Sequence, residues 1–216
     1  MFYLGKKELT INKKEILFVI LAGGLSSRFE GGLKTFAKIN GKTLIQIIIN
    51  FLKKQNVEVV INTNFEEKLF KKSNLPIIKD IKLGFQGPLA GIHSAMFWAN
   101  KKKKCKKWIF AIPCDTPFLP ENLIDRFVNN KNQKAEVLIA RSNGKIHPTV
   151  SMWDVNLLNK LEDELSNNNR KIMEFVKKNH FNFIDFKFNN LDPFFNINTK
   201  SDLEIFKNQI KINLNN

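Results

Sequence analysis

A loop of small and cationic residues follows the first long apolar run of the sequence. Residues 21–34 read LAGGLSSRFEGGLK, so Arg28 and Lys34 lie six residues apart. Small residues let backbone N–H groups approach phosphate oxygens, and the two cations can neutralise phosphate charge. The pattern is neither GxGxxG nor the P-loop pattern, so it favours neither a dinucleotide site nor a P-loop. We predict a cradle for a nucleoside triphosphate, the alternative being an ordinary glycine turn with two surface cations.

A carboxylate, Asp115, follows a later apolar run, within the segment CDTPFLP at residues 114–120. A carboxylate at the end of a strand beside a triphosphate loop can hold Mg²⁺ as a hard oxygen ligand that bridges phosphate oxygens. We therefore predict Asp115 as a metal ligand. The alternative is that it caps a helix expected to begin near Pro120.

The chain has two cysteines, Cys105 and Cys114. They lie nine residues apart, without a CxxC pattern or a matching histidine pair, so neither a zinc site nor a disulfide framework is indicated. Cys114 has no paired base, and we expect it to pack in the interior rather than act as a nucleophile.

The elements that must position these residues alternate along the chain. Strands are expected at residues 16–21, 57–61, 77–78, 108–112, 137–140 and 181–186. Helices are expected at residues 43–54, 66–73, 88–99, 120–128, 155–165, 170–178 and after Thr199. Such alternation predicts right-handed βαβ units. The expected fold class is α/β: a single three-layer αβα domain, Rossmann-like, with a mostly parallel sheet.

The length of 216 residues suits one domain, which we place at residues 15–216 after a lead-in segment at 1–14. The longest apolar stretch, residues 16–22, is far short of the roughly 20 residues of a membrane helix. No signal-peptide pattern precedes it. We expect a cytoplasmic protein without a membrane partner.

The charge balance is strongly basic, with 35 Lys and Arg against 20 Asp and Glu and a net charge of +15. All but four of the cations are lysines, so guanidinium groups for reading nucleic acids are scarce. This composition favours solvated lysine faces and an anionic small-molecule substrate, and no specific nucleic acid is expected. A polyanion partner remains the alternative.

Three further segments, in order with the loop, carry a resemblance to a known family. They are GPLAGI at residues 87–92, CDTPF at 114–118 and NINT at 196–199. Together, from about Val19 to Leu203, the chain resembles the molybdenum cofactor guanylyltransferases of the nucleotidyltransferase superfamily. The resemblance implies an Mg²⁺-dependent enzyme that transfers GMP from GTP to the terminal phosphate of molybdenum-molybdopterin and releases pyrophosphate. It also implies molybdoenzyme apoproteins or their chaperones as candidate partners.

The resemblance also implies roles for individual residues. The implied catalytic residues are Arg28, Lys34 and Asp115. The implied nucleotide-binding residues are Leu21, Ala22 and Gly23 through their backbone, together with Lys34, Asn62, Asp80 and Asp115. Without the family, Asn62 would be interpreted as a turn residue and Asp80 as a solvated acid.

On the side of the second substrate, the resemblance implies four pterin-side residues: His147, Arg170, Asn196 and Asn198. His147 lies in a His-Pro element, and taken alone it would more often be a structural histidine. The two asparagines could instead cap the final helix, as could Thr199.

Two rival functions remain open. One is a related cytidylyltransferase or sugar-phosphate nucleotidyltransferase. The other is a noncatalytic nucleotide- or cofactor-binding delivery protein. Glu30, which places a negative charge in the phosphate loop, keeps the second rival open.

Overall fold

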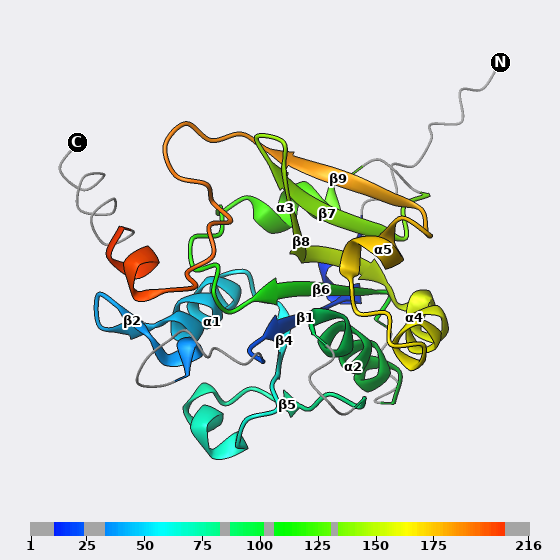
Figure 1. Ribbon diagram of the computed structural model, residues 1–216, viewed down its shortest axis with the longest axis horizontal. Coiled ribbons are helices and arrows are strands. Elements are labelled where there is room, and N and C mark those ends of the chain that lie inside the picture. The colour runs from blue at the N-terminus through cyan, green and yellow to red at the C-terminus, as the bar shows by residue number, and fades with distance from the viewer. Residues whose placement is uncertain (1–10, 24–32, 83–86, 102–105, 131–133, 206–216) are drawn as a thin grey trace.

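The computed structural model describes residues 11–23, 33–82, 87–101, 106–130 and 134–205. Within these ranges the main sheet has seven strands in the order β5-β4-β1-β6-β8-β7-β9, which runs from bottom to top in Figure 1. The strands are β1 (Ile16–Leu21), β4 (Glu58–Asn62), β5 (Ile77–Ile78), β6 (Trp108–Pro113), β7 (Val137–Ser142), β8 (Lys145–Asp154) and β9 (Phe181–Phe186). Neighbouring strands are parallel except at β8, which runs antiparallel to β6 and β7.

Helices cover both faces of the sheet. They are α1 (Leu44–Lys54), α2 (Pro88–Lys101), α3 (Leu123–Val128), α4 (Leu158–Ser166) and α5 (Ile172–Val176). Short 3-10 helices lie at η1 (Lys13–Glu15), η2 (Lys34–Phe36), η3 (Glu67–Ser73) and η4 (Val155–Leu157). A two-stranded hairpin, β2 (Lys38–Ile39) with β3 (Lys42–Thr43), leads into α1.

All six residues of β1 are buried because the strand is central and both of its faces are covered. Ile16, Phe18 and Ile20 pack in the core beneath α1 and α3. Leu17 and Val19 pack in the core beneath α2, α4 and α5. The three-layer αβα fold with a mostly parallel sheet, as predicted, is therefore the observed one.

The ten-residue strand β8 was not predicted. It follows β7 through a tight turn at Asn143 and Gly144, whose φ values of 43° and 87° are both positive. Asn-Gly is a strong hairpin signal, whereas a proline such as Pro148 is unusual in the interior of a sheet. The structure accommodates Pro148 in a bulge, because the register of β8 against β7 shifts beside it.

Other differences concern helix type and boundaries. The segment expected as a helix at 66–73 is a 3-10 helix, and α3 begins at Leu123 rather than at Pro120. The helix expected at 170–178 is shorter, at Ile172–Val176. The helix expected after Thr199 is present at residues 200–205, where the description of the chain ends.

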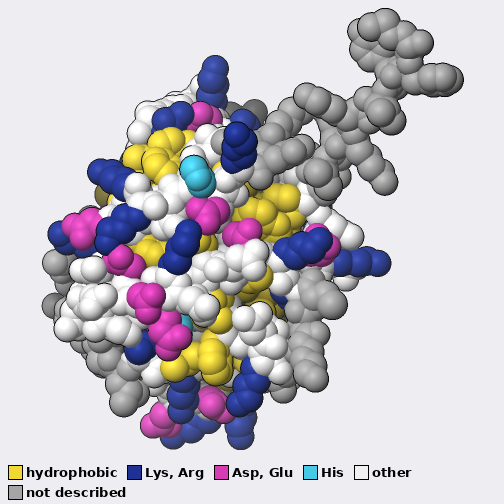
Figure 2. Space-filling view, turned by 90° about the vertical axis from the view of Figure 1, so that its right-hand side faces the viewer, with side chains coloured by type: hydrophobic (Ala, Val, Ile, Leu, Met, Phe, Trp, Pro, Cys, Tyr) yellow, Lys and Arg dark blue, Asp and Glu magenta, His cyan; other side chains and the backbone are white. Residues whose placement is uncertain are grey.

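The described helices include none that is both long and apolar enough to cross a membrane. On the face in Figure 2, Lys and Arg side chains alternate with Asp and Glu rather than forming one continuous basic area. Ion pairs in and beside α4 and α5 show the same mixing: Lys178, just after α5, pairs with Glu164 of α4, and Lys171, just before α5, pairs with Glu174.

Candidate active site

The carboxyl ends of four parallel strands meet at one edge of the sheet. Leu21 at the end of β1 is aligned with Asn62 of β4 on one side and Pro113 of β6 on the other. Asn62 is in turn aligned with Ile78 of β5. In open α/β sheets, ligands bind beyond this edge. The candidate residues that follow these strands are therefore brought together by the topology.

Lys34, at the start of η2, lies between two oxygen-bearing side chains. Its Nζ is 2.5 Å from Oδ2 of Asp115 and donates to Oδ1 of Asn198 at 2.6 Å. The Lys34 and Asp115 side chains are only 15% and 18% exposed. Partial burial weakens screening by water, so this pair has more electrostatic weight than a surface ion pair.

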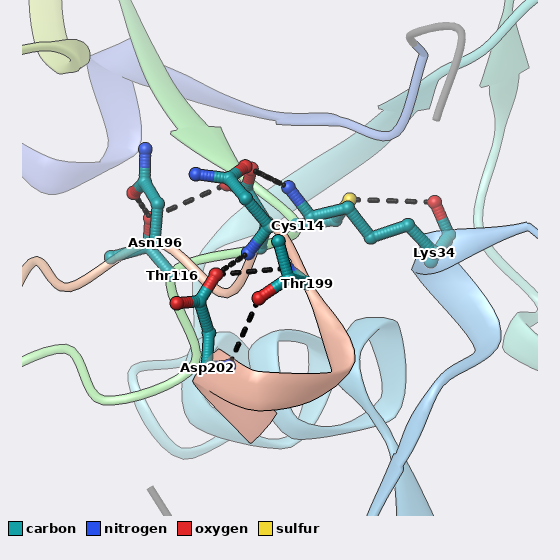
Figure 3. A network of polar contacts seen from close by, with 9 residues as sticks. Lys34, Cys114, Thr116, Asn196, Thr199 and Asp202 are labelled. Carbon is teal, nitrogen blue, oxygen red and sulfur yellow. Dashed lines mark hydrogen bonds and ion pairs between the residues drawn. The ribbon is translucent and has the colours of Figure 1, made fainter. Parts of the chain in front are cut away.

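The segment after β9, which includes Asn196 and Thr199 in Figure 3, is fastened to the residues that follow β6. Asp115 accepts at its backbone oxygen from the N–H of Ile197, at 2.9 Å. Thr116 donates through Oγ1 to Oδ1 of Asn196 at 2.7 Å. These contacts join the segment to the end of β6, so that residues 80 or more positions apart form one cluster.

The final helix is capped by Thr199 rather than by an asparagine side chain. Oγ1 of Thr199 accepts from the N–H of Asp202, and Asp202 Oδ2 accepts from the N–H groups of Asn198 and Thr199, both at 2.8 Å. Burial alone would raise the pKa of Asp202, but these hydrogen bonds outweigh it and lower the pKa. The side chains of Asn196 and Asn198 are therefore left for the contacts with Thr116 and Lys34.

The two residues expected on the nucleoside side are joined by a hydrogen bond. Asn62 Nδ2 donates to Asp80 Oδ1 at 2.9 Å, and Asn64 Nδ2 donates to Asp80 Oδ2 at 2.8 Å. The N–H of Asp80 donates back to Oδ1 of Asn64. Asn62 is 5% exposed, so the network fixes the orientation of its amide. The sequence did not single out Asn64.

Close packing around Gly91 of α2 explains why the GPLAGI segment has a glycine at this position. A Cβ at this position would collide with the Asn62 side chain and would lie 2.7 Å from Cδ2 of Leu21. Glycine is therefore needed for α2 to approach the ends of β1 and β4 this closely. The segment has a packing role directly behind Asn62.

The described residues of the loop at 21–34 are its first three and its last two. The carbonyl oxygen of Leu21 accepts from the N–H of Cys114, and the N–H of Ala22 donates to the carbonyl oxygen of Asn62. Gly23 is exposed. Arg28, predicted as catalytic, and Glu30 lie outside the described residues.

Cys114 packs in the interior, as expected. It is 6% exposed, and its Sγ lies 3.4 Å from Oγ1 of Thr35. Burial, followed by the neighbouring Asp115 carboxylate, raises the pKa of the thiol to about 12. At neutral pH it is therefore a thiol and a poor nucleophile.

Three of the four predicted pterin-side residues line one pocket of about 340 Å³. The pocket lies beside the Lys34 cluster because Asn198 belongs to both. Its lining consists of Lys145, Ile146, His147, Pro148, Thr149, Phe194, Phe195, Asn196, Asn198 and Asp202. Arg170 is not among these residues. It is exposed, its side chain donates to Asn168, and its backbone oxygen lies near Gly87 at the start of α2.

The donor set near Lys34 fits a metal that takes most of its ligands from a substrate. Among the described residues, no group of three or more His, Cys, Asp and Glu side chains could hold a metal ion. Asp115 offers one carboxylate, and Asn198 offers an amide oxygen within reach of the same Lys34 cation. Mg²⁺ is commonly held by one or two carboxylates together with substrate phosphates, so Asp115 suits such an ion.

Comparison with known proteins identifies close sequence relatives. The family model described as MobA-like NTP transferase domain matches residues 18–181. A Yersinia pestis (strain Pestoides F) protein named molybdenum cofactor guanylyltransferase is 36% identical over 189 residues, which cover 88% of this chain and 93% of that protein. A protein of the same name from Yersinia pseudotuberculosis serotype O:1b (strain IP 31758) matches with the same identity and coverage.

Solved structures share the fold. The molybdopterin-guanine dinucleotide biosynthesis protein A from Archaeoglobus fulgidus superposes with a TM-score of 0.72 at 23% identity, covering 90% of this chain and 98% of that one. A cytidylyltransferase from Leptospira borgpetersenii gives a TM-score of 0.65 at 20% identity, covering 92% and 87%. At these identities the likeness supports the fold alone, which agrees with the αβα architecture described above.

Proposed function

Given that the chain belongs to the MobA-like NTP transferase family, we propose that it transfers GMP from GTP to the terminal phosphate of molybdenum-molybdopterin. The products are molybdopterin guanine dinucleotide and pyrophosphate. The observation that carries this proposal is the cluster of Lys34, Asp115 and Asn198. The cluster shares Asn198 with the 340 Å³ pocket and follows β6 at the same sheet edge as Asn62 of β4.

In this proposal the pterin phosphate oxygen attacks the α-phosphorus of GTP. A phosphate is already ionised at neutral pH, so the nucleophile needs no general base. The protein contributes position and charge. Lys34, with a partly buried ammonium group, is suited to hold phosphate oxygens as negative charge develops on them.

Asp115 is the residue that would hold Mg²⁺. When bound there, Mg²⁺ would neutralise phosphate charge and polarise the bonds to phosphorus. The ion pair between Lys34 and Asp115 keeps both groups in place in the free protein. Asp115 exchanges this partner, wholly or in part, when substrate arrives.

Asn62 and Asp80 form the proposed nucleoside side. Asp80 takes a hydrogen bond from Asn62 and another from Asn64, so neither Asn62 nor Asp80 can rotate freely. A site with fixed donors and acceptors discriminates between bases because the wrong base leaves polar atoms unpaired. This rigidity supports selective binding of one nucleotide.

The pocket beside Asn198 supports a site for the second substrate. Asn198 both lines the pocket and contacts Lys34, so a phosphate carried by a ligand of the pocket would arrive next to the nucleotide phosphates. The residues proposed to bind the pterin substrate are therefore His147, Asn196 and Asn198, without Arg170.

The direct test is incubation of the purified protein with Mg²⁺, molybdenum-molybdopterin and each nucleoside triphosphate in turn. Formation of the guanine dinucleotide with one equivalent of pyrophosphate supports the proposal. Formation of the cytosine dinucleotide would move the protein to the cytidylyl group. GTP binding without transfer would favour a delivery protein instead.

A further inference from the structure

Two polar residues lie behind the wall of the 340 Å³ pocket and contact the pocket residue His147. Ser142 at the end of β7 is 1% exposed, and His147 is 6% exposed. Asp192, on the segment after β9, has a side chain that is 14% exposed. Nε2 of His147 lies 2.5 Å from Oγ of Ser142 and 3.5 Å from Oδ2 of Asp192. Neither Ser142 nor Asp192 lines the pocket itself.

The donors around Asp192 indicate a carboxylate that only accepts. Oδ1 accepts from Ser142 Oγ at 2.9 Å and from the N–H of Phe194 at 2.9 Å. Oδ2 accepts from Nζ of Lys145 at 3.3 Å. Three donors on one carboxyl group leave no contact in which it would need a proton of its own.

This arrangement determines where the proton of His147 lies. Ser142 has a single hydroxyl hydrogen, and it is directed to Asp192. The short contact between Ser142 and His147 must then be a hydrogen bond donated by Nε2–H of the imidazole. His147 is therefore in the Nε2–H tautomer, with a lone pair on Nδ1.

Nδ1 of His147 is the part of the ring left for a ligand. It makes no hydrogen bond within the described part of the chain. Among the described residues, the fully buried side-chain polar atoms without a hydrogen-bond partner are the two ring nitrogens of His93, so Nδ1 of His147 is not fully buried. Burial lowers the pKa of His147, Asp192 opposes this effect, and Lys145 adds to it. The ring of Phe194 packs at 4.9 Å between ring centroids. The pocket therefore contains a neutral imidazole with one accepting nitrogen.

We propose that Asp192 is a positioning residue for the second substrate: through Ser142 it holds His147 as the Nε2–H tautomer, so that Nδ1 accepts a hydrogen bond from an N–H group of the bound pterin ring. The inference rests on the proposed function for the identity of the substrate. A pterin ring carries amino and ring N–H groups, whereas an ionised phosphate carries no donor. His147 thus contacts the ring end of the substrate, whereas Lys34 contacts its phosphate end.

The tautomer can be measured without any substrate. In ¹⁵N-labelled protein, long-range ¹H–¹⁵N NMR spectra report which nitrogen of each imidazole carries the proton. The chain has three histidines, so a His147→Gln variant assigns the signals. We expect protonated Nε2 and unprotonated Nδ1 at His147. A proton on Nδ1 in the wild-type protein would overturn the inference.

Asp192→Asn tests the positioning role, because an amide can both donate and accept and no longer dictates the direction of the hydrogen-bond chain. We expect a mixture of His147 tautomers and a rise in the KM for the pterin substrate by the inverse of the fraction that stays Nε2–H, about twofold for an equal mixture, with the KM for GTP unchanged. Ser142→Ala interrupts the same chain and should give the same pattern. Ser142→Ala replaces Asp192→Asn in this test if Asp192→Asn does not fold. Asp185→Asn, at the exposed pair with Arg141 on the same strand pair, is the matched control and should change neither quantity.

The outcomes separate the two hypotheses. If the wild-type protein forms no guanine dinucleotide, the proposed function is wrong, whatever the tautomer. If transfer occurs but both variants keep the wild-type tautomer and the wild-type KM for the pterin substrate, the positioning role is wrong. A purely structural role would lower stability and kcat without a selective rise in that KM, and this result would also overturn the inference.

Discussion

Lys34 and Asp115 form an ion pair of 2.5 Å at the carboxyl end of β6, although 81 residues separate them in the sequence. A cation and a carboxylate in contact at a partly buried site neutralise each other until a ligand provides new partners. The two groups that are expected to handle phosphate and metal are therefore held ready, close to their working positions.

Asp115→Asn should lower the rate of transfer by about 100-fold or more, because the neutral amide is a weak ligand for Mg²⁺ and charge on the phosphates is then poorly neutralised. The fold should be retained because the replacement has nearly the same shape. Product formation at saturating Mg²⁺ and GTP measures the loss, and circular dichroism measures the fold. Asp125→Asn, at an exposed pair with Lys13, should keep normal activity. Turnover of Asp115→Asn within threefold of wild type would exclude Asp115 as the metal ligand.

Lys34→Ala should weaken GTP binding and transfer by about 10- to 100-fold, because a charge-assisted contact to phosphate is lost in a partly buried site. Lys101→Ala, at the exposed end of α2, removes the same charge from the surface and should have almost no effect at moderate salt. Calorimetric titration with GTP compares the two. Equal losses in both variants would mean that the general basic charge, rather than the loop, attracts the nucleotide.

Asn62→Ala should reduce the preference for GTP over CTP by about tenfold, since the amide held by Asp80 is lost as a discriminating group. Asp80→Ala should have a similar effect because it also releases Asn62. Asn64→Ala leaves the contact between Asn62 and Asp80 intact and should retain most of the preference. Titrations at fixed salt with each nucleotide measure the ratios. Indifference of the wild-type protein to the base would contradict the nucleoside assignment.

Gly91→Ala should destabilise the protein by about 1–3 kcal/mol, because the added methyl group collides with Asn62 and Leu21. GTP binding should also weaken, since Asn62 must move. Urea unfolding measures the stability. For unfolding, Gly23→Ala is the control, because a Cβ at that position meets no atom within 4 Å. An unchanged unfolding midpoint for Gly91→Ala would show that α2 can shift at little cost.

His93 of α2 should make the protein less stable in mild acid. Both ring nitrogens are buried without partners. Burial lowers the pKa of His93 from 6.5, with Glu162 and Asp80 opposing the shift and Lys82 adding to it. The unfolded chain therefore binds a proton below about pH 6.5 that the folded chain refuses, and stability falls by roughly 1 kcal/mol per pH unit below that point. His93→Leu should remove this part of the slope and leave the part that comes from His147, whose pKa burial also lowers. His180→Leu, at an exposed position, should change neither part.

The measurement for His93 is urea unfolding between pH 7 and pH 5.5, where most carboxylates stay ionised. His93→Leu should also be at least as stable as wild type at pH 7, because two unpaired buried nitrogens are removed. The same slope in wild type and His93→Leu would assign the acid sensitivity to another group.

The sequence predicted those parts of the fold and site that depend on local pattern. The continuous apolar run at Ile16–Leu21 indicated a central strand, and a carboxylate just after a strand indicated Asp115 as a site residue. Strand β8 was not predicted, because the segment around His147 and Pro148 was interpreted only as a His-Pro element, and it is the pairing with β6 and β7 that shows it to be a strand.

Contacts between distant segments could not be read from local pattern. Asn198 was assigned with equal weight to a helix cap or to the pterin side, and its contact with Lys34 spans 164 positions. Asp192 and Ser142 were not singled out at all, because nothing in their immediate surroundings shows that they meet behind His147. Such pairs are determined by tertiary packing rather than by periodicity or motif.

The segment that carries Asn196 and Asn198 also has a consequence for biosynthesis. All seven strands of the main sheet are complete by Phe186, so a nascent chain can assemble the sheet before this segment emerges from the ribosome. The contacts of Asn198 with Lys34, and of Ile197 with Asp115, form only afterwards. A chain released prematurely, shortly after β9, could therefore fold its sheet and display the ends of β1, β4 and β6, yet it would lack the far side of the cluster around Lys34.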